Sequence, residues 1–477
     1  MMNNTEVKNR LQRFDSTTLA YAIQKAFPFL FQNTDQLRQE LDKYVFPRLD
    51  FLAEIENHQY YFLFEEHYVE TEWKDMISMH YINTSYEVVN TVMRIHLFLE
   101  EEMNEQPYMG CFTMRTIDEP HIMLSYIYPN WKYVTYDDKP LNIMTYQKEV
   151  HINGKEIIFN TYPLFIQDNA VVTCAQACLV SMSKYLHSRY DYNRIRIGKI
   201  DDSYHSNKTK AYPSQGLFPT QMLEILNSHD IPCGYQMYND PAEFKEYIDY
   251  CVESAIPVLV GIRVKENGNS KKAGSHVIQI IGHSDVETQK RYVIYDDSGY
   301  YLKKLEGNGF VECISWEVLS RSLEKNKSFI IYSIHEKVYI YFENFKMRMN
   351  DMLCRMKMDA MMDVDGKNGN RRILLIDNRE AKRFLQENMA CDVNVRQDVR
   401  EEAGRLLQID MPHYLWCCEY STAMGNMLFL ADPTYNRRTT KNIFLNKVPL
   451  ICKSQMQDFQ GNCNTSRNTE KQHFFDF

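Results

Sequence analysis

The order of secondary-structure signals between Tyr162 and Tyr341 constrains the fold of this chain more than any other feature. Helical apolar periodicity comes first, over residues 174–186, 219–228 and 241–253. Apolar, β-branched runs typical of strands follow, at 256–264, 276–282, 292–296 and 329–335. Helices followed by a run of strands predict an α+β domain, because a doubly wound parallel sheet would alternate strands with helices.

The flanking regions predict two further α+β modules. In the first, residues 83–102 predict an amphipathic helix with Val88, Val92, Ile95 and Leu99 on one stripe. Residues 148–159 predict a hairpin that turns at Asn153-Gly154, since a type I′ turn needs positive φ at both central positions. The expected organisation is an N-terminal module at 1–160, a central domain at 161–345, a C-terminal module at 346–455 and a polar tail at 456–477.

In the C-terminal module, strands are predicted at 371–376, 413–418 and 427–431. Asp377 is expected to cap a helix, with Glu380 completing a capping box. The methionine-rich segment 346–362 predicts a helix that fills a core, with an adaptable partner surface as the alternative. Residues 363–369 resemble a calcium loop, but Leu374 stands where the twelfth-position carboxylate belongs, so we expect a polar turn.

Charge and composition exclude several functional classes. The formal net charge of −9 should repel a phosphate backbone, so no nucleic-acid partner is expected. No apolar run approaches the roughly 18 residues of a membrane-spanning helix, and the polar N-terminus lacks the apolar core of a signal peptide. We therefore expect a cytoplasmic protein without a membrane partner, whose twelve cysteines are mostly reduced thiols.

Cofactor and metal signals are weak in this sequence. Neither standard glycine-rich phosphate loop occurs, which removes the main support for nucleotide hydrolysis. Cys174 with Cys178, and the adjacent Cys417 and Cys418, come nearest to a zinc-ligand spacing. The sequence predicts no cofactor and no bound metal.

Cys174 carries the clearest chemical signal. Small and periodic apolar residues follow it, which places it at the start of a helix, where unpaired N–H groups and a partial positive charge favour a thiolate. Gln167 precedes it on an irregular segment and could donate its amide N–H to an oxyanion. Cys178 lies one turn further along, so packing is its expected role.

A nucleophilic thiolate needs a base, and the base needs an acceptor that orients it. His276 enters one predicted strand, and Asp296 ends the next. Neighbouring antiparallel strands joined by a short loop bring the start of the first beside the end of the second. We therefore expect His276, and not His283, to be the base and Asp296, rather than Asp297, to orient it.

This pattern resembles the papain-fold cysteine peptidases, and most closely the C39-like group. The likeness extends from about Phe165 to Gly299. It implies a papain-like central domain, with helices followed by an antiparallel sheet. It also implies an oxyanion donor at Gln167, a nucleophile at Cys174, a base at His276 and an orienting group at Asp296. A protein or peptide substrate is expected.

The chain also departs from its nearest family pattern. Thr173 and Ala175 stand where leader-processing members usually carry Asp and Gly around the cysteine, and no transporter is attached. Cleavage of double-glycine leader peptides is therefore not expected.

Three functional interpretations remain open at this point. The first is a thiol hydrolase that cleaves peptides. The second is an acyl transferase, deamidase or amidase, because a thioester can be resolved by water or by an amine. The third is a noncatalytic, possibly zinc-binding scaffold in which Cys174, Cys178, His276 and His283 are structural.

The flanking modules are expected to restrict or select the substrate. Neither shows a nucleophile with a base, a metal cluster or a phosphate loop in its sequence. His413 and Cys417 lie four residues apart on a predicted strand, about 13 Å, which is too far for a hydrogen bond. A regulatory protein partner could bind the methionine-rich segment.

Overall fold

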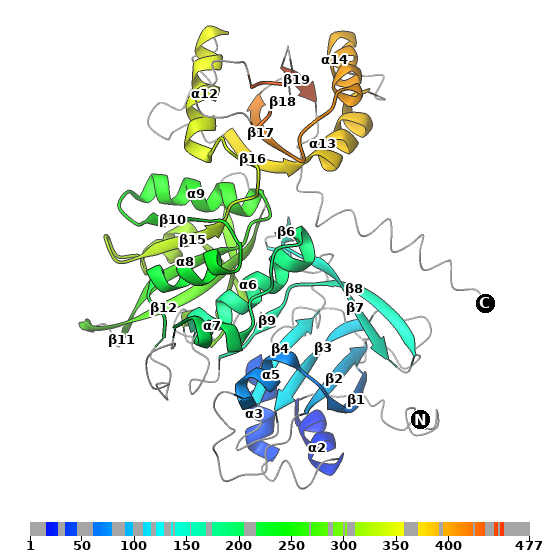
Figure 1. Ribbon diagram of the computed structural model, residues 1–477, viewed down its shortest axis with the longest axis vertical. Helices are drawn as coiled ribbons and strands as arrows, with labels where there is room; N and C mark the ends of the chain where they lie inside the picture. The colour runs from blue at the N-terminus through cyan, green and yellow to red at the C-terminus, as the bar shows by residue number, and fades with distance from the viewer. Residues whose placement is uncertain are drawn as a thin grey trace. The chain divides into compact units, whose positions relative to one another are not determined.

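The fold is described from a computed structural model and belongs to the α+β class (Figure 1). The description covers residues 16–26, 34–44, 61–78, 91–98, 108–115, 121–127, 135–136, 139–152, 154–167, 174–204, 216–266, 269–284, 290–298, 301–302, 311–356, 371–390, 395–422, 425–434, 443–446 and 449–452. The chain forms two compact units: Met1–Tyr238 with Leu259–Ile331, and Asn239–Val258 with Tyr332–Phe477. The boundaries expected from the sequence, at residues 160, 345 and 455, differ from this division.

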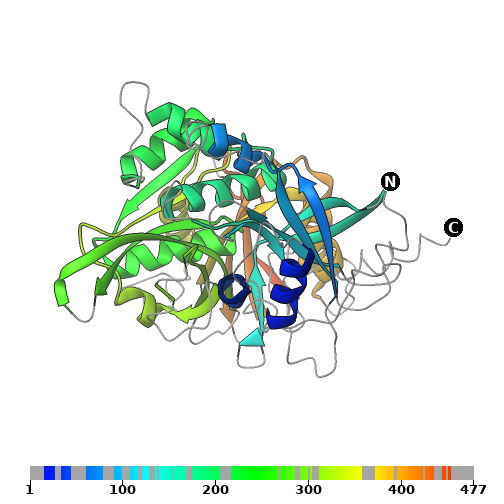
Figure 2. The same ribbon diagram turned by 90° about the horizontal axis from the view of Figure 1, so that it is seen from below.

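The first part of unit 1 is an antiparallel sheet with a separate hairpin (Figures 1 and 2). The sheet order is β1 (Tyr61–Tyr68), β2 (Val92–Phe98), β3 (Tyr108–Arg115), β4 (His121–Ile127) and β9 (Leu164–Phe165). This part of unit 1 also contains three helices, α2 (Ser16–Ala26), α3 (Thr34–Tyr44) and α5 (Thr71–Met76). The hairpin is β7 (Tyr146–Ile152) with β8 (Lys155–Thr161), and its residues Val150, Ile152 and Phe159 pack on apolar side chains of the sheet.

The helix predicted over 83–102 is wrong in its described part, because Val92–Phe98 is strand β2. This strand pairs with β1 on one side and β3 on the other, and six of its seven residues are buried. Arg94 and His96 alternate with Met93, Ile95 and Leu97 in this segment, so the sequence also carried the period-2 pattern of a strand beside the helical spacing. Residues 83–90 and 99–102 lie outside the described ranges.

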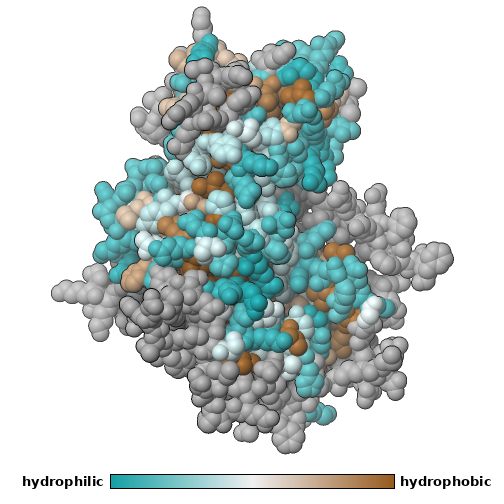
Figure 3. Space-filling model, in the orientation of Figure 1, coloured by the Kyte–Doolittle hydropathy of each residue, from teal (hydrophilic) through white to brown (hydrophobic). Residues whose placement is uncertain are grey.

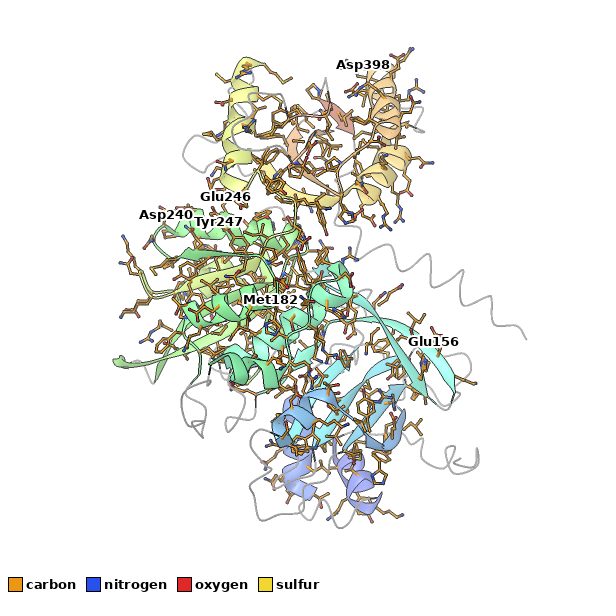
Figure 4. All side chains as sticks on the ribbon, in the orientation of Figure 1. Glu156, Met182, Asp240, Glu246, Tyr247 and Asp398 are labelled. Atoms are coloured by element: carbon orange, nitrogen blue, oxygen red, sulfur yellow. The ribbon has the colours of Figure 1, made fainter. Side chains whose placement is uncertain are left out.

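The hairpin predicted at 148–159 is present. Ile152 pairs with Lys155 across the turn, and Gly154 has a φ of 81°, which favours glycine. Asn153 lies outside the described residues. Figure 4 labels Glu156, an exposed residue of β8.

The second part of unit 1 contains the central sheet. Its main path is β10 (Cys233–Met237), β15 (Phe329–Ser333), β11 (Val258–Glu266), β12 (Asn269–Ser284), β13 (Arg291–Tyr295) and β14 (Val311–Ser315). Strand β6 (Lys139–Ile143) also pairs with β12 and with the short β5 (Thr135–Tyr136). Helices α6 (Cys174–Tyr190), α7 (Ile197–Tyr204), α8 (Pro219–Ser228) and α11 (Trp316–Ser320) complete this part. The expected order holds in part, because α6, α7 and α8 precede β11, β12 and β13. It departs from the prediction where the unpredicted β10 precedes α9 (Pro241–Glu253) and where α11 lies between β15 and the unpredicted β14.

Unit 2 has a four-stranded sheet with helices on both faces, as Figure 1 shows. The strands are β16 (Arg371–Asp377), β17 (Tyr414–Thr422), β18 (Gly425–Ala431) and β19 (Leu450–Cys452). On one face, Trp416 stacks on Phe345 of α12 (Phe342–Arg355) with ring centroids 5.0 Å apart. On the other, Cys417 joins an apolar core with α13 (Asn378–Leu385) and α14 (Gln397–Gln408). The outer surface near α14 is largely hydrophilic in Figure 3.

Helix α9 (Pro241–Glu253) belongs to unit 2 because its C-terminal end is bonded to β16. Ser254 Oγ accepts the backbone N–H of Leu375 at 2.8 Å, and Arg371 donates to Glu246 at 2.8 Å. Figure 4 labels Asp240, Glu246 and Tyr247 along this helix. From the sequence, these residues were expected in the central domain.

Other C-terminal predictions have mixed outcomes. Asp377 caps α13 by accepting the N–H of Arg379, but Glu380 lies 3.6 Å from Arg383, so the capping box is half formed. In the methionine-rich segment, Met349 is fully buried, whereas Met347 is 59% exposed. Residues 357–370, with the calcium-like loop, and the tail at 456–477 lie outside the described residues. Among the described helices, none combines the length and apolar character needed to cross a lipid bilayer.

Candidate active site

Cys174 is the first residue of α6 and is partly exposed. The next twelve residues of this helix are all buried, so α6 is a core helix whose first turn reaches the surface. The backbone N–H of Phe165 donates to Ser181 Oγ at 2.9 Å, which fixes the helix against β9. Figure 4 labels Met182, a fully buried residue in this helix. The thiol therefore lies on a rigid element at the positive end of a helix dipole.

Cys178 has the packing role that its position predicts. Its fully buried thiol donates to the backbone oxygen of Val277 at 3.7 Å, and burial raises its pKa well above the ordinary value. This contact joins the first turns of α6 to β12, one residue after His276. It brings together the two elements that carry Cys174 and His276.

His276 lies between the Cys174 thiol and the Asp296 carboxylate. Its Nε2 is 2.7 Å from Asp296 Oδ1, and only 8% of the residue is exposed. Burial alone would lower the pKa of His276. The side-chain hydrogen bonds to Asp296 and to Cys174 outweigh burial, so its pKa lies well above the ordinary value of 6.5.

Asp296 is held by donors on both of its oxygens. Oδ1 accepts from His276 and from the hydroxyl of Ser298 at 3.1 Å. Oδ2 accepts the backbone N–H groups of Tyr301 at 2.7 Å and Leu302 at 3.1 Å. Burial raises the pKa of this carboxyl, but His276 and the backbone donors outweigh burial and lower it below the ordinary value. The fully buried side chain is therefore a fixed anion.

Asp297 differs from Asp296 in its hydrogen bonding and in its pKa. It is also fully buried, but neither of its side-chain oxygens has a hydrogen-bond partner among the described residues. Its Oδ1 is 3.9 Å from His276 Nε2, beyond hydrogen-bond distance. Burial, with a further contribution from the charge of Asp296, raises the pKa of Asp297 to about 8. Asp296, and not Asp297, therefore faces the ring, as the sequence predicts.

Gln167 follows β9 by two residues and is half-buried. The segment before it is firmly anchored. The hydroxyl of Tyr295 in β13 donates to the Phe165 oxygen at 2.6 Å, and the N–H of Ile166 donates to the Met123 oxygen at 2.7 Å. Gln167 therefore extends from a segment fixed to both α6 and β13, while residues 168–173 lie outside the described ranges.

The hairpin geometry differs in one respect from the prediction. His276 was expected at the start of a strand, but β12 begins at Asn269, so His276 lies in its interior. The pairing of Gln279 with Tyr295 puts Asp296 just beyond the end of β13, opposite this part of β12. The strand is longer than predicted because polar residues 269–275 continue it. The proximity of His276 and Asp296 holds despite the longer strand.

His283 does not belong to this site. It lies seven residues further along β12, about 23 Å at the rise of a strand, and pairs with Asn142 and Tyr292. The zinc set of Cys174, Cys178, His276 and His283 therefore does not converge. A different group, His276, Asp296 and Asp297, offers atoms within 4.8 Å of one another that could ligate a metal ion.

Sequence reasoning missed the backbone donors that hold Asp296. Tyr301 and Leu302 are helical residues that follow the strand and the turn at 297–298, and a backbone donor has no signature in the residue types. The unpartnered state of Asp297 was missed for the same reason. Only the Asp-Asp-Ser-Gly run at 296–299 indicated a turn at this point.

No protein-family model matches this chain, and no curated protein matches it.

Proposed function

We propose that this chain is a papain-like thiol hydrolase, and specifically a cysteine peptidase. Cys174 is the nucleophile, His276 the base, Asp296 the group that orients the base, and Gln167 the oxyanion donor. One observation carries the proposal: the His276 ring has the Cys174 thiol as one partner and Asp296, at 2.7 Å, as the other. A nucleophile, a base and an orienting acid in this sequence of contacts are the requirements of covalent acyl transfer.

The tautomer of His276 follows from these contacts. Its Nε2–H donates to the fixed anion Asp296, which leaves Nδ1 for the Cys174 thiol. Nδ1 takes the thiol proton, and the thiolate forms a bond to the carbonyl carbon of the substrate. The amide N–H of Gln167 stabilises the resulting oxyanion. His276 then protonates the leaving amine as the carbon–nitrogen bond breaks, which gives a thioester on Cys174.

Water completes the reaction. It attacks the thioester carbonyl while His276 accepts one of its protons, and the carbon–sulfur bond then breaks. The proton returns to the Cys174 sulfur, and a carboxylic acid leaves. An amine in place of water would give a transferase, and a side-chain amide as substrate would give a deamidase. We favour a protein or peptide substrate from the resemblance of residues 165–299 to the papain-fold peptidases.

Thiol labelling of the whole chain tests the proposal. We expect a chloroacetamide probe to label Cys174 selectively at low dose, with the site identified by peptide mass spectrometry. Cys174→Ala should abolish this label. Cys178→Ala is the matched control, because it removes a thiol one turn away whose buried side chain contacts Val277, and it should leave the label on Cys174. Labelling of Cys178 with Cys174 untouched would disprove the assignment.

A metal site is the second candidate function, because His276, Asp296 and Asp297 can ligate together and Asp297 has no hydrogen-bond partner among the described residues. Metal analysis of the purified chain separates the two. Stoichiometric zinc that blocks labelling of Cys174, with labelling restored by a chelator, would favour the metal site. Metal-free protein with rapid labelling would favour the hydrolase.

A further inference from the structure

A small polar pocket of about 70 Å³ lies in unit 1 beside the N-terminal sheet. Arg94 of β2 and Tyr126 of β4 contribute from the sheet, Lys148 from the β7–β8 hairpin, and Arg194 from the segment after α6. A single water needs roughly 10–15 Å³, so this volume holds several waters or one small ion of a few heavy atoms. The pocket contains none of Cys174, His276 and Asp296, and its role is therefore independent of the proposed function.

The two arginines are held in place but keep free donors. Arg94 donates through Nε to Glu65 at 2.5 Å, and its guanidinium lies 3.9 Å above the centre of the Tyr68 ring. Arg194 donates through one terminal nitrogen to Glu72 at 2.6 Å, while its Nε is buried without a partner among the described residues. A guanidinium has five N–H donors, so each arginine has donors left for a ligand.

Lys148 supplies a cation without a carboxylate partner among the described residues. Its ammonium lies 5.1 Å from the centre of the Tyr126 ring. Burial is the main cause that lowers its pKa, and the charge of the nearby Glu70 leaves the loss of water around Lys148 without full compensation. An anion in the pocket would provide that compensation.

The positive charges around the pocket outnumber the carboxylates. Glu65 offsets Arg94, and the single carboxylate of Glu72 serves both Arg194 and the buried Lys184. Lys148 is the remaining cation, and it forms no ion pair with the nearby Glu70. The pocket therefore favours an anionic ligand.

Glu70 restricts which anion fits. It is 5% exposed, lines the pocket, and is a carboxylate acceptor without an ion-pair partner among the described residues. A ligand beside it must donate a proton to it. Tyr68 and Tyr126 also line the pocket, and burial raises both of their pKa values, so both stay as phenols that donate. Hydrogen phosphate has oxygens for the cations and phenols and one P–OH for Glu70, whereas sulfate lacks the proton at neutral pH.

From these contacts we propose that the pocket binds a phosphate group, with Arg94, Lys148 and Arg194 as its cationic contacts and Glu70 as the acceptor of its P–OH. The phosphate is either the free ion or the terminal group of a small monoester, because the volume admits little more than the phosphate itself. The P–OH that Glu70 accepts belongs to the dianion of the free ion and to the monoanion of a monoester.

Calorimetric titration of the full chain with inorganic phosphate, at constant ionic strength, tests the proposal. We expect saturable binding that is at least about tenfold tighter than binding of sulfate, since a hydrogen bond to a charged group contributes about 1.5–3 kcal/mol. Lys148→Gln should weaken phosphate binding about tenfold or more. Lys155→Gln is the matched control, because it removes an equal charge from an exposed position of the same hairpin, and it should leave the affinity unchanged.

Further measurements identify the ligand and test the proposal without relying on Lys148→Gln alone. Glu70→Gln should reduce the preference for phosphate over sulfate. Tighter binding of glycerol phosphate than of inorganic phosphate assigns the pocket to a monoester, and the reverse assigns it to the free ion; both support the proposal. If Lys148→Gln does not fold, the wild-type unfolding midpoint should still rise more with phosphate than with sulfate. Absence of saturable phosphate binding, equal affinity for sulfate, or an equal loss in Lys155→Gln would overturn it.

Discussion

Replacing Asp296 with Asn is the sharpest test of how the candidate site is built. The substitution keeps the shape of the side chain but leaves one acceptor oxygen where the native carboxylate has two. In the structure, Oδ1 serves His276 while Oδ2 serves the N–H groups of Tyr301 and Leu302. If the Asn oxygen stays with the two backbone donors, its NH₂ group faces Nε2 of His276. Nε2 must then accept a hydrogen bond, so the protonated ring is disfavoured and the pKa of His276 falls.

The size of the effect follows from the contact that is lost. A hydrogen bond to a charged group contributes about 1.5–3 kcal/mol. At about 1.4 kcal/mol for each factor of ten, the alkylation rate of Cys174 near neutral pH should fall roughly 10- to 150-fold. The expected direction is a decrease, because the thiolate loses the imidazolium that stabilises it.

The assay is the rate of alkylation by iodoacetamide, measured at Cys174 and at Cys354 in the same sample by peptide mass spectrometry. Cys354 is exposed and belongs to α12 in unit 2, so it is an internal standard. Asp297→Asn is the matched variant, because Asp297 lies 3.9 Å from His276 without a hydrogen bond and its loss should have a smaller effect. An unchanged ratio of Cys174 to Cys354 labelling in folded Asp296→Asn would refute the assigned role of Asp296.

Three further predictions concern single side chains. Gln167→Ala should lower turnover of a peptide substrate about 10²- to 10³-fold. The alkylation rate of Cys174 should stay unchanged, because an oxyanion donor acts after the thiolate forms. Equal turnover in the wild type and in Gln167→Ala would contradict this role. Asp297→Asn should remove a pH dependence of the free energy of unfolding. Because the pKa of Asp297 is raised from 3.8 to about 8, the folded state binds more protons than the unfolded state between these pH values. Wild-type stability therefore falls by up to about 1.4 kcal/mol per pH unit as pH rises through this window. Urea unfolding at pH 5 and pH 8 measures this slope, which should be shallower in the variant. Glu72→Gln should lower the free energy of unfolding by about 3–5 kcal/mol, because the buried carboxylate, whose pKa is lowered to about 2, pairs with Lys184 at 2.7 Å and Arg194 at 2.6 Å. Urea unfolding at pH 7 measures this loss, and a loss below about 1 kcal/mol would contradict the prediction.

Helix α9 shows what local sequence determines. Its start and end were predicted at the observed residues, because Asp240 and Pro241 specify an N-terminus whatever lies around them. The Asp240 carboxylate accepts the N–H groups of Ala242 and Glu243 at 2.8 and 2.9 Å. The unit to which α9 belongs depends on its distant contact with β16, and the sequence pattern of the helix contains no trace of that contact.

The strands that were missed or mistaken depend on tertiary structure. Strands β10 and β14 lie at the two edges of the central sheet and are partly exposed, so their apolar patterns are weak. Strand β2 was mistaken for a helix although Arg94 and His96 alternate with apolar residues, because its apolar residues also fit a helical spacing. The proximity of His276 and Asp296 could be predicted because it depends on one hairpin. The donors to Asp296 could not, because they are backbone N–H groups of helical residues that follow β13.

Asp296 and Asp297 are adjacent and have identical side chains, but they differ in protonation state. In the proposed mechanism, two ionised carboxylates beside His276 would hold its proton more tightly than one, whereas an acid catalyst works best with a pKa near the working pH. Asp296 has His276 and two backbone donors, which keep it ionised despite burial. Asp297 has no such donors in the described structure, and its pKa of about 8 keeps most of its population protonated at neutral pH. The ring therefore faces one negative charge, which orients it and stabilises its protonated form.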